Sequence, residues 1–115
     1  MNTATLTETK TDKIRALNDH FRKDPRGGQI VITQSLCALG PDTVRKALQA
    51  VRGFTAFDGG NDPYKEHDFG DPEVDGVKLF FKIDYFDKGL TNHSPDPADP
   101  AKTIWVMTIM LREEY

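Results

Sequence analysis

Residues 77–87 read V-K-L-F-F-K-I-D-Y-F-D, which is a strong strand pattern around which the rest of the fold can be arranged. Side chains alternate between two faces along a β-strand, so residues at every second position lie together. One face would carry Val77, Leu79, Phe81, Ile83 and Tyr85. The opposite face also holds two large apolar side chains, Phe80 and Phe86. We therefore predict a strand over 77–87 that needs apolar contacts on both of its faces.

Residues 103–112, T-I-W-V-M-T-I-M-L-R, predict a second strand of the same two-sided kind. The intervening residues 88–102 contain S-P-D-P-A-D-P and predict a loop. Two strands joined by one loop favour an antiparallel pair. Helices can cover one face of this pair. The apolar side chains of the other face could be covered by the 88–102 loop, by a second copy in a homodimer or by a partner protein. Alternatively, the core is self-contained and needs no further cover.

Two helices are predicted upstream of this pair. Ile14, Leu17 and Phe21 form one helical stripe, which Thr11 or Asp12 could cap and which ends before Pro25. The second helix begins at Gly40-Pro41-Asp42, because proline suits the first position of a helix. Its apolar stripe is Val44, Leu48, Val51 and Phe54, and Gly53 suits its C-terminal end.

The residues from Gln29 to Leu36 are short, rich in β-branched side chains and preceded by Gly27-Gly28, which predicts a further strand. Residues 57–76 are rich in glycine and proline and predict a long loop. The fold class is therefore α+β: a small antiparallel or mixed sheet of three to four strands with two helices packed on one face. We expect residues 1–10 to be a flexible N-terminal tail and residues 11–115 to be a single domain.

The composition places the chain among small globular proteins. It has 115 residues, of which 37% are apolar and 29% are charged. No apolar run approaches the roughly 20 residues that span a bilayer, and the N-terminus does not resemble a secretory signal. Cys37 is the single cysteine, which excludes an internal disulfide framework and agrees with a reducing compartment. We expect a cytoplasmic protein that does not bind membranes.

The charges are distributed unevenly. Residues 1–53 carry a net charge of +4 and residues 54–115 a net charge of −7. The segment 58–75 contains seven acidic residues and one basic residue, Lys65. Such a field favours a cation or a basic protein surface and repels the nucleic-acid backbone. With a pI of about 5.5 for the chain, nucleic-acid binding is not expected.

Ten consecutive residues carry most of the candidate chemistry: N-D-P-Y-K-E-H-D-F-G, residues 61–70. Asn61-Asp62-Pro63 predicts a turn, because Asn and Asp side chains accept hydrogen bonds from nearby backbone amides. On an extended chain Glu66 and Asp68 would share one side, and His67 and Phe69 the other. The candidate binding residues are Asn61, Asp62, Tyr64, Glu66, His67 and Asp68.

His67 has both a structural and a catalytic interpretation. A histidine at the edge of a core is commonly a structural residue. The catalytic interpretation pairs it with Asp84 or Asp87 to make a general base, with Glu66 and Asp68 as further candidates. Asp84, which has apolar neighbours, needs a partner such as His67, Lys82 or a backbone amide.

Metal and cofactor chemistry receive little support from the spacing of these residues. Asp62 and His67 are weak metal candidates, because the surrounding sequence fits neither H-E-x-x-H nor a calcium-binding loop. The glycine pairs do not extend to a phosphate-binding motif. We therefore expect no cofactor and no dedicated metal site.

Three motifs together resemble a known family. They are N-D-P-Y-K-E-H-D-F-G at 61–70, K-I-D-Y-F-D at 82–87 and T-I-W-V-M-T-I-M-L-R-E-E-Y at 103–115. With L-N-D at 17–19 and I-T-Q at 32–34, this pattern resembles a family of small bacterial proteins, domain of unknown function 3768, over nearly the whole chain. The resemblance implies genes of plasmids, phages and other mobile elements, and an accessory or anti-defence role without an established activity.

Two functions therefore remain open. The first is a non-enzymatic interaction protein that presents the acidic 58–75 segment to a basic surface on a partner protein. The alternative is a small hydrolase or metal-dependent enzyme centred on His67 with nearby carboxylates. The enzyme requires these groups to converge in a hollow, whereas the interaction protein requires an exposed acidic surface.

Overall fold

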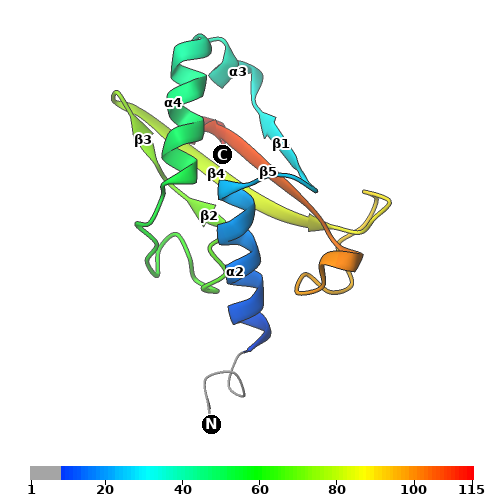
Figure 1. Cartoon of the computed structure of the whole chain (residues 1–115). Helices are drawn as coiled ribbons and strands as arrows, with labels where there is room; N and C mark the ends of the chain where they lie inside the picture. The colour runs from blue at the N-terminus through cyan, green and yellow to red at the C-terminus, as the bar shows by residue number, and fades with distance from the viewer. Residues whose placement is uncertain (1–8) are drawn as a thin grey trace.

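The computed structural model describes residues 9–115, and most of the tail predicted for residues 1–10 lies outside them. Three α-helices, five strands and two short 3-10 helices follow one another along this part of the chain (Figure 1). In order they are α2 (Lys10–Lys23), β1 (Gln29–Ile32), α3 (Gln34–Cys37), α4 (Pro41–Arg52), β2 (Phe69–Gly70), β3 (Glu73–Val74), β4 (Val77–Phe86), η1 (Pro100–Lys102), β5 (Ile104–Leu111) and η2 (Arg112–Glu114).

The sheet is mixed, with the strand order β1-β5-β4-β2 and with β3 paired to β4 beside this path. β4 and β5 are antiparallel in the register Phe81↔Ile109, as their joining loop predicted. β1 runs parallel to β5 and aligns Ile30 with Met107. The α+β class is confirmed. The strand count exceeds the predicted three or four because the segment 69–74 adds two strands of two residues each.

α2 and α4 lie on one face of the sheet (Figure 1). The strand residues that point toward them include Leu79, Phe81 and Ile109, which are completely buried. From the helices, Phe21 and Val51 join the same hydrophobic cluster. Burial of such side chains contributes about 1.5–3 kcal/mol each, so this layer holds the helices on the sheet.

None of the helices in residues 9–115 is long and apolar enough to cross a membrane.

The helix ends follow ordinary capping chemistry. Thr9, rather than Thr11 or Asp12, caps α2: its hydroxyl accepts from the Asp12 amide, and the Asp12 carboxylate accepts from the Thr9 amide. α4 begins with Pro41 at its first turn, as predicted.

The strand predicted over Gln29–Leu36 is only half correct, because β1 ends at Ile32. Thr33 caps the short helix α3 by accepting a hydrogen bond from the Leu36 amide. The capping preference of threonine therefore overrides the strand preference of the residues around it.

The face of the sheet opposite the helices is only partly covered. Its side chains on β4 and β5 include Phe86, Ile104 and Val106, which are half-buried. The helices α2 and α4 lie on the other face of the sheet (Figure 1). Tyr115, next to η2, packs against Phe80 at one end of this face, with a ring-centroid distance of 5.4 Å. Both strand faces thus carry apolar side chains. The helices cover one face, and the other is half-open.

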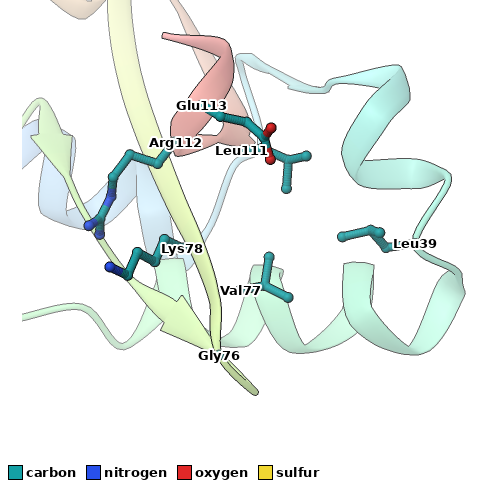
Figure 2. A pocket seen from close by; sticks show the side chains of 7 residues that line it. All are labelled: Leu39, Gly76, Val77, Lys78, Leu111, Arg112 and Glu113. Carbon is teal, nitrogen blue, oxygen red and sulfur yellow. The ribbon is translucent and has the colours of Figure 1, made fainter.

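A hollow of about 570 Å³ lies near the end of β5, and Figure 2 shows the side chains that line it. Leu39, Val77 and Leu111 point into it from three different segments of the chain. Lys78 and Arg112 extend away from it. None of the site residues predicted from the sequence lines this hollow, so it is separate from the candidate site.

Candidate functional site

His67 lies between two carboxylates, one on α2 and one in its own loop. Its Nδ1 is 2.8 Å from Oδ1 of Asp19, on α2, and its Nε2 is 3.6 Å from Oδ2 of Asp62, in the loop. The imidazole is stacked on the Phe57 ring with a centroid distance of 3.9 Å. His67 thus pairs with Asp19 and Asp62, and not with the predicted partners Asp84 or Asp87. The two predicted partners make other contacts.

Asp84 and Asp87 have local roles. The Asp84 carboxylate is 3.2 Å from the Lys82 ammonium on the half-open face of β4. Lys82 is one of the three partners that the sequence offered. Asp87 accepts hydrogen bonds from the amides of Thr91 and Asn92 and so closes the turn after β4. Asp84 thus lies on the face of β4 that points away from the helices, and Asp87 belongs to the turn that follows the strand.

The loop that carries His67 is built around Asn61, which is buried. The Asn61 side chain accepts from the Asp58 amide and donates to the Ala56 carbonyl and the Asp71 carboxylate. Asp62, also buried, accepts from the His67 amide. These bonds agree with the predicted Asn-Asp-Pro turn. They also give Asn61 and Asp62 a part in shaping the loop.

The residues around His67 do not continue as an extended chain. Lys65 and His67 have positive φ angles of 59° and 57°, a backbone conformation that residues other than glycine adopt uncommonly. The predicted alternation of Glu66 and Asp68 against His67 and Phe69 therefore fails. Phe69 instead lies on the half-open face, where it packs against Phe80 and Tyr115.

A buried polar network joins this loop to α2 and β4. Asn18 is completely buried, and its Nδ2 donates to the Glu66 carbonyl at 3.0 Å and to the Tyr85 hydroxyl at 2.8 Å. The Tyr85 hydroxyl in turn donates to Oε1 of Glu66 at 2.8 Å. Burial raises the pKa of Tyr85, and so does the hydrogen bond that its hydroxyl donates to the Glu66 carboxylate. The network holds Glu66 in place by both its backbone and its side chain.

Arg22 is a second link between α2 and the loop. Its side chain is 3% exposed, and its guanidinium donates to Asp19 at 2.8 Å and to the Phe54 carbonyl at 3.3 Å. It also lies 5.0 Å from the centre of the Phe57 ring. Burial raises the pKa of Asp19, but hydrogen bonds from His67 and Arg22 outweigh this effect and leave the pKa below its usual value.

Asp19, Arg22 and Asn18 were missed as site residues by the sequence analysis, although L-N-D was noted as a motif. One signal was available for Asn18. It falls four residues after Ile14, on the apolar stripe of α2, where a polar side chain must be buried and hydrogen-bonded. Nothing in the sequence indicates that its partners, Glu66 and Tyr85, lie 48 and 67 residues further along the chain.

The arrangement offers limited chemistry. Asp19 and His67 line a hollow of about 300 Å³, and Asp62 and His67 line another of about 590 Å³. A carboxylate at Nδ1 orients the ring so that Nε2 can exchange a proton. In residues 9–115 no three His, Cys, Asp or Glu side chains are grouped as metal ligands, so the weak candidates Asp62 and His67 gain no third partner.

Asp68 differs electrostatically from the other carboxylates. The pKa of Asp68 is raised from 3.8 to about 6. Partial burial is the largest cause, and the negative charges of Glu66, Asp62 and Asp84 contribute the rest. Glu66 is held by Tyr85 and Asp84 by Lys82. Asp68 is therefore the acid of this group whose ionised form the fold supports least.

We expect Asp68→Asn to stabilise the protein at pH 7.5 and to have little effect near pH 4. The raised pKa means that the folded state retains a proton that the unfolded state releases between about pH 4 and pH 6, so wild-type stability falls as pH rises through that range. With screening at this half-exposed position, the gain is about 1 kcal/mol above pH 6. Urea unfolding at several pH values measures it. Asp99→Asn controls for the loss of one negative charge, and equal gains in both variants would contradict the assignment.

The comparisons with known proteins identify a family and no individual relative. No curated protein and no solved structure matches the chain. One family model matches residues 32–114, which includes the His67 loop, β4 and β5 and excludes α2 with Asn18 and Asp19. The chain therefore belongs to the family described as Protein of unknown function (DUF3768).

Proposed function

We propose that this chain is a non-enzymatic accessory protein that binds a partner protein, and that the acidic loop, residues 58–75, contacts a basic surface on that partner. The observation that carries the proposal is the exposure of Tyr64, which is 74%, on a loop whose backbone is fixed by internal hydrogen bonds. An exposed tyrosine on a fixed loop backbone among acidic residues is suited to binding, because aromatic anchors dominate interfaces and the backbone need not be ordered on association.

Apart from the half-buried Asp68, the acids of the loop divide into two groups. Asp62 and Glu66 are engaged by the loop itself and by Tyr85. Asp58, Asp71, Glu73 and Asp75 are exposed. The first group, with Asn61, would shape the loop, and the second would supply the field that attracts a basic partner.

The setting of this interaction is part of the proposal. We place it in the cytoplasm, in agreement with a single, exposed cysteine, Cys37. The mobile-element and anti-defence roles implied by the family resemblance are consistent with a small protein that acts by binding.

Neutralising the exposed acids should abolish partner binding without unfolding the protein. The variant D58N/E73Q/D75N removes three negative charges. Asparagine can keep the turn contacts of Asp58 and tolerates the positive φ of 50° at Asp75. We expect the immobilised wild type to retain host proteins at 150 mM salt and to release them at 500 mM, and the variant to retain none of them.

A matched variant, D42N/D99N/E113Q, removes three acids outside the loop, two of them exposed and Asp99 half-buried, and should retain the same proteins as the wild type. If both triple variants recover the wild-type set, the acidic loop is not the contact surface. If the retained host proteins bind equally well at 150 and 500 mM salt, their recognition does not depend on charge.

The contact between Asp19 and His67 favours a second candidate, a hydrolase in which His67 acts as general base. Asp62 borders the same imidazole, whereas Asp84 does not contribute to it. A chromogenic ester or phosphoester cleaved by the wild type and not by His67→Gln would support this enzyme. Equal rates would exclude His67 as its base.

A further inference from the structure

A hollow of about 410 Å³ lies beside the acidic loop, at the end of the half-open sheet face. Four aromatic side chains line it: Tyr64 from the loop, Phe69 from β2, Phe80 from β4 and Tyr115 next to η2. Phe69, Phe80 and Tyr115 pack together with ring-centroid distances of 4.9 and 5.4 Å, the latter for both contacts of Tyr115. Tyr64 and Tyr115 are 74% and 72% exposed, so the hollow opens to solvent between them.

Asp68 lines the same hollow and gives it a negative charge. Within residues 9–115 its carboxylate forms no ion pair and accepts no hydrogen bond from another residue. Asp62, Glu66 and Asp84 are close enough to act on it electrostatically. The hollow therefore combines aromatic faces, which carry negative potential, with a carboxylate in a field of further carboxylates.

Two basic residues near these rings, Arg112 and Lys82, already have partners. The Arg112 guanidinium lies over the Phe80 ring, 5.2 Å from its centre, but Arg112 does not line the hollow. Lys82 is paired with Asp84. The contact of Arg112 demonstrates that this aromatic cluster accepts a cation on one of its faces, and no basic side chain of the described residues lines the hollow itself.

We propose that this hollow, the Asp68 pocket, binds the cationic end of a lysine or arginine side chain from the partner protein. The proposal rests on the proposed function and assigns the specific contact within it. An alkyl stem would pack on Phe69 and Phe80, and the charged group would lie between the aromatic walls and Asp68. Lysine and arginine share this chemistry, and separate probes distinguish them.

The probes are three capped tripeptides with a central lysine, arginine or norleucine between glycines, added to the isotope-labelled full chain at 150 mM salt. Norleucine keeps the apolar stem without the charge. We expect saturable NMR shifts in Tyr64, Phe69, Phe80 and Tyr115 with millimolar dissociation constants for the lysine or the arginine peptide. The norleucine peptide should bind at least fivefold more weakly.

Two variants test the pocket directly. Asp68→Asn should weaken binding of the cationic peptide at least fivefold, and Tyr64→Leu at least twofold. Within the described residues the Tyr64 side chain is 74% exposed and forms no hydrogen bond, so its replacement does not threaten the fold. The variant D58N/E73Q/D75N should change the dissociation constant less than twofold, because its acids lie outside the pocket. Equal binding of norleucine, or unchanged binding by Asp68→Asn, would overturn the proposal.

These outcomes separate the pocket from the wider function. If no peptide binds at the pocket while neutralisation of the exposed acids still abolishes partner retention, the pocket assignment is wrong and the interaction surface remains. If the cationic peptide binds as expected while neutralisation leaves partner retention unchanged, the pocket is a cation site and the role of the exposed acids is wrong.

Discussion

Asn18→Asp should destabilise the protein by about 3–5 kcal/mol, the cost of an uncompensated charge in a buried position. The change alters one atom of the side chain and almost no volume. Asn18 is completely buried, and its Nδ2 donates to the Glu66 carbonyl and the Tyr85 hydroxyl. A carboxylate would place an oxygen against both of these oxygens, and the Tyr85 hydrogen is already donated to Glu66. Three acceptors would then face one another without a donor.

Urea unfolding followed by circular dichroism measures this loss. Gln49→Glu makes the same chemical change at an exposed position of α4 and should alter stability by less than about 0.5 kcal/mol. The Asn18 variant should regain part of its stability in acid, where the new carboxyl group takes up a proton. A free energy of unfolding within 1 kcal/mol of the wild type would show that the amide does not hold the loop to α2.

This network explains how the acidic loop acquires a fixed shape. Regular structure between α4 and β2 is absent from the described residues 53–68 apart from turns. Side-chain bonds of Asn61 and Asp62 close the loop on itself, and Asn18 and Arg22 attach it to α2. Since ordering an exposed segment on binding costs free energy, a loop fixed in advance is the kind of surface that binds a partner efficiently.

The parts of the fold that could be predicted from sequence are those with a long local pattern. β4 and β5 alternate over eight or more residues, and α4 combines a proline start with a full apolar stripe. β2 and β3 have two residues each, too few to show any period. The parallel pairing of β1 with β5 joins segments more than seventy residues apart, and no local preference encodes it.

The same distinction holds for the candidate site. The turn at Asn61-Asp62 depends on neighbouring residues and was predictable from side-chain chemistry. The partner of His67 was not, because Asp19 is 48 residues away and reaches the ring only after α2 packs on the sheet. The positive φ at His67 also removed the alternation on which the predicted facing of Glu66 and Asp68 depended.

Gly70→Ala should destabilise the protein by about 2–4 kcal/mol, at or above the usual cost of overpacking a core. Gly70 ends the candidate motif and pairs with Phe81 across β2 and β4. A Cβ atom at this position would lie 2.3 Å from Cε2 of Phe81 and 2.7 Å from Cε2 of Phe54. Phe81 is completely buried and also packs edge-on against Phe54 and Phe57, so its ring has no free space into which to move.

Gly59→Ala is the matched control, because a Cβ atom there meets no atom within 4 Å. It should leave stability unchanged or raise it by up to about 1 kcal/mol, since alanine reduces the freedom of the unfolded chain. Urea unfolding of both variants separates the clash from a general effect of alanine in the loop. Displacement of Phe81 would also shift the Phe57 ring on which His67 is stacked. We therefore expect the Gly70 variant to change the NMR signals of His67. A destabilised variant with unchanged His67 signals would show that a change in the core does not alter the structure of the loop.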